Sequence, residues 1–211
     1  MKKHISAQDI TAMETQQRIH FINSIGGFKS IALIGTQNNQ QQTNLAIFSS
    51  VIHIGSNPAL FGIISRPASV ERHTLNNILE SGFYTLNHIN KDIYIQAHQT
   101  SARYDKEASE FDVTGLETEY KNNFLAPFVA QSNVQLAMVF KQKIDLEINN
   151  TVLIIGEVHA VYFPENCQQA DGFLDLEKAN TITCTGLDSY HTTQKINRLS
   201  YAKPNKEIII L

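Results

Sequence analysis

Side chains that can bind an anion recur in the early part of the chain. Ser49 and Ser50 are adjacent in a predicted strand. Arg66 follows the next predicted strand, and His73 and Thr74 open a predicted helix. The start of a helix carries free N–H groups and a partial positive charge, which favour a negatively charged ligand. Hydroxyl groups and an arginine fork beside such a helix start would form a cradle for a phosphomonoester.

Each of these side chains also has an ordinary structural interpretation. Paired serines are common on strand surfaces, Arg66 suits a solvated position, and Thr74 suits a helix N-cap that binds no ligand. The residue types and their spacing therefore leave a phosphate site and plain surface positions open as alternatives.

The remaining polar residues form no recognised catalytic or metal-binding pattern. Glu107, Glu110 and Asp112 lie in a charged stretch, which we expect to be a solvated surface rather than an acid–base pair. Cys167 and Cys184 form no CxxC motif, and we expect two reduced thiols. The eight histidines are scattered without an HxH or HExxH pattern, so we predict no metal site. No side chain is assigned a catalytic role.

Composition and charge narrow the range of partners. The chain has 17 basic and 20 acidic side chains and a formal net charge of -3. Nucleic-acid binding usually requires a basic surface that neutralises phosphates, so we expect no nucleic-acid partner. No segment approaches the roughly 20 apolar residues of a membrane span, and the N-terminus lacks the apolar stretch of a signal peptide. We therefore expect a cytoplasmic protein that does not bind membranes.

Hydrophobic periodicity and turn residues predict many short strands and few helices. The predicted helices cover residues 6–22, 73–80 and 91–103, and the predicted strands cover residues 30–36, 44–54, 60–65, 83–87, 135–148 and 152–163. Residues 104–124 indicate a charged surface loop, and the apolar residues 208–211 should dock on the domain or on a partner subunit. The pattern is typical of a mainly β protein with a closed or sandwiched architecture.

Several short motifs, taken in order, resemble the flavin reductase-like family and its flavoredoxin-like branch. They are the strand at residues 43–51, the turn and strand start at 56–60, Arg66-Pro67, His73-Thr74, Asn77-Ile78 and the segment 82–88. Ala59 stands where a second proline is common in the family. The match covers roughly residues 25 to 165, and residues 186–191 resemble one branch of the family.

The resemblance implies a fold, a cofactor and an assembly. The fold is a Greek-key split β-barrel with a few peripheral helices, in a single domain of residues 1–211 with an N-terminal helix and a C-terminal tail. The assembly is a homodimer with FMN at the subunit interface. Matched position by position, the residues around the isoalloxazine ring would be Asn44, Leu45 and Ala46, and those around the phosphate and ribityl chain would be Ser49, Ser50, Arg66, His73 and Thr74.

Three further positions have two interpretations each. Asn87 either supports the edge of the ring or satisfies main-chain groups of the barrel. Tyr190 and His191 either close over the flavin or bind substrate, or they lie on an ordinary surface loop.

The resemblance also implies a reaction. An FMN-binding oxidoreductase of this family would pass a hydride from NAD(P)H to the flavin and then deliver electrons to an acceptor, and the cofactor would carry the chemistry. The alternative is an FMN-binding electron-transfer protein without NAD(P)H activity, and a further one is a fold relative that binds another ligand or none. The nicotinamide preference, the final acceptor and the tightness of FMN binding stay open.

Overall fold

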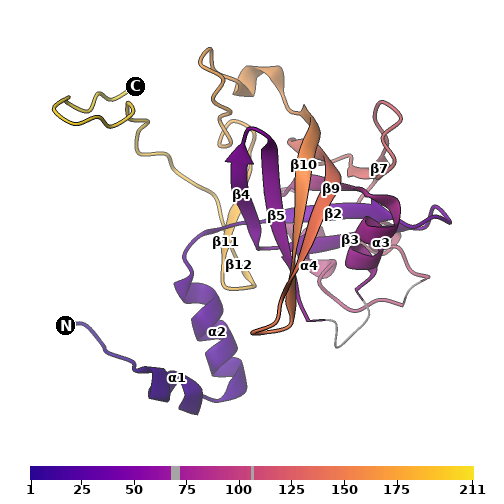
Figure 1. The fold of residues 1–211 in the computed structure, drawn as a ribbon, viewed down its shortest axis with the longest axis horizontal. Coiled ribbons are helices and arrows are strands. Elements are labelled where there is room, and N and C mark those ends of the chain that lie inside the picture. The colour runs from indigo at the N-terminus through magenta and orange to yellow at the C-terminus, as the bar shows by residue number, and fades with distance from the viewer. Residues whose placement is uncertain (68–71, 106) are drawn as a thin grey trace.

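A curved antiparallel sheet forms the body of the protein (Figure 1). The computed structural model describes residues 1–67, 72–105 and 107–211. The seven strands of the sheet, in spatial order, are β3 (Thr43–Phe48), β2 (Ala32–Gln37), β6 (Phe83–His88), β9 (Gln135–Leu146), β10 (Thr151–Tyr162), β5 (Ala59–Ser65) and β4 (Val51–Ser56). The mainly β prediction is confirmed. A hairpin at Asn149 and Asn150 joins β9 to β10, between the predicted strands 135–148 and 152–163.

Strands β3 and β4 follow one another in the chain but lie at opposite edges of the sheet. The prediction of one strand over residues 44–54 is therefore wrong, because the chain breaks at Ser49 and Ser50 to cross between the two edges. The Ser50 hydroxyl donates to the Ile64 carbonyl oxygen and accepts from the Ile64 N–H, each at 3.2 Å. This serine fixes the crossing segment to β5.

Shorter elements surround the sheet. A three-stranded sheet contains β1 (Lys29–Ser30), β11 (Thr183–Thr185) and β12 (Ser189–His191), and a two-stranded sheet contains β7 (Thr118–Glu119) and β8 (Phe128–Val129). The helices are α1 (Ala7–Ala12), α2 (Thr15–Ile25), α3 (His73–Ser81), α4 (Tyr94–Gln99), α5 (Glu110–Thr114) and the 3-10 turn η1 (Glu165–Cys167). Within the described residues, no helix is long and apolar enough to cross a lipid bilayer.

Two hydrophobic clusters hold these layers together. Inside the curve of the sheet, Tyr84 of β6 and Ile154 of β10 pack with Ile78 of α3. On the other side of β3, Leu45 packs with Phe111 of α5. The predicted surface loop at 104–124 is thus wrong in part, because α5 and its neighbours bury large side chains under β3.

The N-terminal segment forms two helices instead of the single predicted one. Ser6 and Asp9 make a capping box at the start of α1. The Glu14 carboxylate then accepts from the N–H groups of Gln16 and Gln17 and starts α2 as a separate helix. Within this described segment, no residue of α1 or α2 is buried.

The C-terminal segment leaves the barrel (Figure 1). Its apolar side chains are exposed. Lys195 and Arg198 anchor its first part through ion pairs with Asp175 at 2.8 Å and Asp171 at 2.6 Å. Residues 208–211 are 56–67% exposed. Docking of these residues on their own domain is therefore wrong, and docking on a partner subunit stays a prediction.

Candidate functional site

A buried cluster of amide and hydroxyl groups joins the start of α3 to the start of β3. The Asn44 side-chain amide donates to Thr74 Oγ1 at 2.9 Å and to Thr36 Oγ1 at 3.3 Å. Asn77 donates to the same Thr36 oxygen at 3.2 Å. The predicted N-cap role of Thr74 is wrong, because Arg72 occupies the N-cap and Thr74 lies in the first turn of the helix. Two predicted site residues, Asn44 and Thr74, are thus in direct contact.

The outer edge of β3 presents its main chain at Leu45. The Leu45 side chain is fully buried, so this residue can meet a ligand only through its main chain. Its N–H donates to Glu110 Oε2 at 2.9 Å. Ala46, the third predicted ring contact, is half-buried on the same strand.

Glu110 is not the solvated carboxylate that the sequence indicated. Its exposed fraction is 7%, and it opens α5 against the edge of β3. Burial raises the pKa of Glu110, while the Leu45 N–H and the charge of His73 counteract part of that rise. No local pattern indicates this contact, because Glu110 and Leu45 are distant in the chain and the stretch around Glu110 is highly charged.

Three arginines, Arg66, Arg72 and Arg103, contribute positive charge near the start of α3. The Arg72 guanidinium donates to the Pro67 carbonyl oxygen at 3.2 and 3.1 Å. Burial lowers the pKa of Arg72, and the nearby charges of Arg66 and Arg103 lower it further. Arg66 and Arg103 are therefore each close enough to Arg72 for their charges to act on it. Of these, the sequence had indicated Arg66 alone, since Arg103 follows a different helix and no local motif connects it to the site.

The predicted phosphate residues fall on two sides of this positive region. Ser50 is bonded to Ile64 of β5, which lies just before Arg66. His73 and Thr74 form the first turn of α3, beside Arg72. The connecting residues 68–71 lie outside the described part of the chain. Hydroxyl, guanidinium and helix N–H groups suit a phosphomonoester, so the donor set fits the phosphate of FMN.

A small polar cavity adjoins the start of β3. Its volume is about 80 Å³, and its lining comes from Asn38, Gln42, Thr43, Asn44, His73, Asn76, Asn77, Glu80 and Ala108. Ligand pockets that enclose a drug-sized molecule have roughly 300 Å³ or more. This cavity is therefore too small to enclose a flavin ring.

Asn87 satisfies main-chain groups of the barrel. Its side chain is 0% exposed, and its oxygen accepts from the Val129 N–H at 3.1 Å. Its amide group donates to the Leu33 carbonyl at 3.1 Å and to Thr85 Oγ1 at 2.8 Å. These bonds agree with the second interpretation of Asn87, and they use both ends of its side-chain amide.

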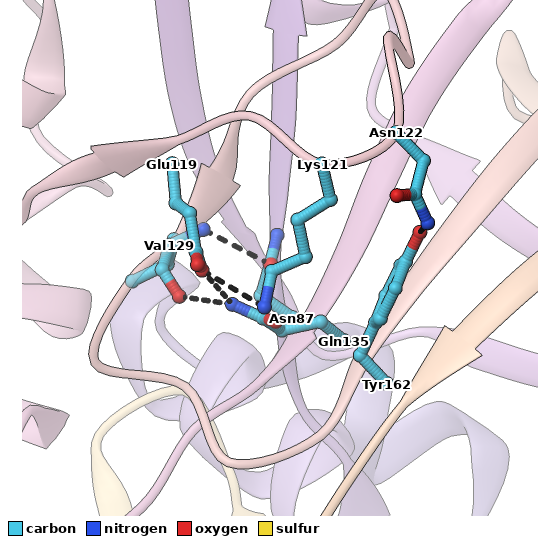
Figure 2. A network of polar contacts seen from close by, with 7 residues as sticks. All are labelled: Asn87, Glu119, Lys121, Asn122, Val129, Gln135 and Tyr162. Carbon is cyan, nitrogen blue, oxygen red and sulfur yellow. Dashed lines mark hydrogen bonds and ion pairs between the residues drawn. The ribbon is translucent and has the colours of Figure 1, made fainter.

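Figure 2 shows the polar network that extends from Asn87 toward the surface. Gln135 donates to the Val129 carbonyl at 2.7 Å and to Glu119 at 3.3 Å, and Glu119 pairs with Lys121 at 3.0 Å. The network connects β6, β8 and β9 and contains none of the predicted phosphate residues. Its role is to hold the barrel wall in place.

Tyr190 belongs to an aromatic cluster on α4 and β12. Its hydroxyl lies 2.8 Å from His98 Nδ1, and its ring centroid is 5.5 Å from that of Tyr94. Burial is the main cause that raises the pKa of Tyr190 to about 12. The sequence singled out neither His98 nor Tyr94.

His191 is held by hydroxyl groups of its own sheet. Its Nε2 lies 3.0 Å from the side-chain oxygens of both Thr185 and Ser189, and its ring meets Phe28 edge-on at 5.1 Å. The interpretation of Tyr190 and His191 as an ordinary loop is wrong, because both lie in strand β12. A contact of these residues with a flavin or a substrate stays a prediction.

The described residues offer no cluster of three His, Cys, Asp or Glu side chains that could hold a metal ion. Cys167 and Cys184 are buried and not bridged to each other.

Comparison with known proteins identifies the fold. The model of the Flavin reductase like domain matches residues 28–179. A crystal structure described as a flavin reductase with a split barrel domain, from Shewanella frigidimarina NCIMB 400, is 52% identical, with a TM-score of 0.92 over 95% of this chain and 100% of that chain. None of the curated proteins compared with the chain matches it.

More distant structures share the fold alone. The 2-nitrobenzoate 2-nitroreductase of Pseudomonas fluorescens is 20% identical, with a TM-score of 0.81 over 97% of this chain and 99% of that chain. Flavoredoxin of Desulfovibrio vulgaris (Miyazaki F) is 18% identical, with a TM-score of 0.70 over 97% and 98%. The predicted split barrel is thus confirmed. The family match and the Shewanella relative together show that this chain belongs to the flavin reductase-like family and is a flavin-related oxidoreductase.

Proposed function

We propose that this protein binds FMN and passes a hydride from NAD(P)H to the flavin, which then delivers electrons to an acceptor. The observation that carries the proposal is the positive region at the start of α3, where Arg72 is the N-cap and the charges of Arg66 and Arg103 act on its guanidinium. The phosphate is the part of FMN that such a region would recognise. Strand β3 lies next to this region. Glu110 occupies the Leu45 N–H, and the remaining main-chain groups of the strand would meet the polar rim of a flavin ring.

Each part of the chain has a distinct task in this proposal. Arg66 and the first turn of α3, with His73 and Thr74, hold the phosphate, and Ser49 and Ser50 hold the ribityl chain near β5. The main chain of Asn44, Leu45 and Ala46 orients the ring. When bound, the flavin supplies hydride and electron transfer, so no side chain has to act as a nucleophile or a general base.

A second copy of the chain is part of the proposal. The small cavity beside β3 cannot enclose a flavin ring, so another surface must cover it. The apolar side chains of α2 and of residues 208–211 are exposed and would be buried in a homodimer. Tyr190 and His191, with their neighbour His98, would then lie on the substrate side of the site.

Anaerobic reduction of bound FMN tests the proposal. The protein is first loaded with FMN, and the absorbance of oxidised flavin is followed after addition of NADH or NADPH. Rapid bleaching by at least one nicotinamide, faster than for free FMN, is expected. Bleaching by dithionite but by neither nicotinamide would instead favour an electron-transfer protein, the alternative that the structural likeness to a flavoredoxin supports.

A further inference from the structure

The carboxylate of Glu110 lies in an unusual place for a charged group. It is 7% exposed, and its Oε2 accepts from the Leu45 N–H at 2.9 Å. A second contact, between Ser109 Oγ and Thr43 Oγ1 at 2.7 Å, holds the start of α5 against the same strand. The carboxylate is therefore fixed at the outer edge of β3.

The described residues that act on this carboxylate include one group that can carry positive charge, His73. Among the described residues, no lysine or arginine forms an ion pair with Glu110. The imidazole of His73, at the start of α3, is the nearby group whose charge acts on it. A buried carboxylate with one main-chain donor and one histidine retains much of its electrostatic effect on other groups close to β3.

We propose that Glu110 is a positioning residue whose negative charge at the edge of β3 makes the site bind oxidised flavin more tightly than reduced flavin. The inference rests on the proposed function, because that function places the ring beside β3, where Glu110 holds the Leu45 N–H. Hydride transfer from NAD(P)H adds one proton and two electrons to the ring and leaves NAD(P)⁺. At neutral pH the reduced ring carries one negative charge, which Glu110 repels. Glu110 thereby promotes the release of reduced flavin to an acceptor.

The variant Glu110→Gln removes the negative charge of the side chain while keeping nearly the same size and shape. Its side-chain oxygen can still accept from the Leu45 N–H, while the negative charge is lost. Asp112→Asn is the matched control, because it removes one charge from an exposed position of the same helix. The dissociation constants for oxidised and for reduced FMN are measured anaerobically for each protein, and their ratio is compared.

We expect the wild-type protein to bind oxidised FMN more tightly than reduced FMN. Glu110→Gln should shift the ratio by about tenfold in favour of reduced FMN, which corresponds to about 30 mV for a two-electron couple. Asp112→Asn should leave the ratio at the wild-type value, and the far-UV spectra should be the same for all three proteins.

Two results would overturn the inference. One is an unchanged ratio in folded Glu110→Gln, which would leave Glu110 a structural cap of β3. The other is tighter binding of reduced than of oxidised FMN by the wild-type protein, and this result decides the matter even if the variant does not fold. Failure of the wild-type protein to bind FMN in either state would reject the proposed function itself.

Discussion

The barrel and the terminal segments of this protein differ in how their side chains are satisfied. In the barrel, buried polar groups such as Asn44 and Asn87 bond to strands and to the first turn of α3. In α1 and α2, which are fully described, no side chain is buried, and Ile25 is 60% exposed. These buried polar side chains thus find their hydrogen-bond partners within the barrel, whereas apolar side chains of the terminal segments stay exposed to solvent.

The two N-terminal helices are too short to be stable without packing. Isolated helices shorter than about 12–15 residues are marginal in water, and α1 and α2 have 6 and 11 residues. Most helical stability in proteins comes from packing of an apolar face. The exposed apolar side chains of these helices would therefore gain stability from a further covering surface, which the proposed homodimer would supply.

The largest expected effect is a loss of stability on substitution of Gly35, in strand β2 of the barrel. A Cβ atom at Gly35 would overlap the Pro127 carbonyl oxygen and lie 2.6 Å from Thr85 Oγ1. Gly35→Ala should therefore lower the free energy of unfolding by about 3 kcal/mol or more. Gly26→Ala at the end of α2, where the nearest atom is 3.9 Å away, should change it by about 0.5 kcal/mol at most. Equal losses in urea unfolding would show that the two regions do not differ in packing.

The next effect concerns association. Deletion of residues 199–211 should leave a folded barrel whose mass by light scattering falls from that of a dimer to that of a monomer. The mass of one chain is 23.7 kDa, so the full-length protein should give about twice that value. A full-length protein that is monomeric at micromolar concentration would contradict the proposal that a second copy covers the terminal segments.

A third effect depends on pH and on His88 of β6. Burial lowers the pKa of His88 to about 4, and the pKa of an unfolded histidine is about 6.5. The unfolded chain therefore binds more protons between these values, so stability falls as the pH decreases through this range. The loss of stability should be on the order of 2 kcal/mol by pH 4. This is less than the full pKa shift would give, because the His88 ring is still partly accessible to solvent.

The variant His88→Gln should reduce that loss, and His53→Gln on β4 controls for the removal of a histidine at an exposed position. Urea unfolding at pH 7, 5.5 and 4.5 measures the difference. A wild-type pH dependence in folded His88→Gln would assign the acid sensitivity to other groups.

The smallest effect is at Tyr84, inside the barrel. Its hydroxyl is buried and has no hydrogen-bond partner among the described residues. Burial raises the pKa of this hydroxyl. Removal of an unpaired buried hydroxyl should leave stability unchanged or raise it by about 1 kcal/mol, so Tyr84→Phe should melt at the same or a higher temperature. A clear decrease would reveal a partner such as a bound water.

Local patterns were sufficient to predict the barrel strands and several of their turns. Gly82, for example, ends α3 with a φ of 77°, as expected of a C-terminal glycine. Local patterns failed where a long-range contact decides the structure. The serine pair breaks the predicted strand because Ser50 bonds to β5, and Glu110 is buried because β3 offers it an N–H.

The candidate site was also predicted only in part, because local patterns do not show which distant segments come together. Arg66, His73 and Thr74 lie near one another in the chain and share a region of the structure. Arg103, His98 and Tyr94 come from or after another helix, and the spacing of residues in the sequence does not show that α4 packs near β3. The break at Glu14 was missed because Ser, Thr, Asp and Asn are the usual N-cap residues.

In the proposed function, the positive region at the start of α3 holds the phosphate of a flavin. The most direct test is a fluorescence titration of the protein with FMN and with riboflavin, which lacks the phosphate. A charge-assisted hydrogen bond contributes roughly 1.5–3 kcal/mol, so FMN should bind at least about tenfold more tightly than riboflavin. Arg66→Ala should remove much of that difference and leave riboflavin binding unchanged. Equal affinities of the wild-type protein for the two ligands would contradict the claim.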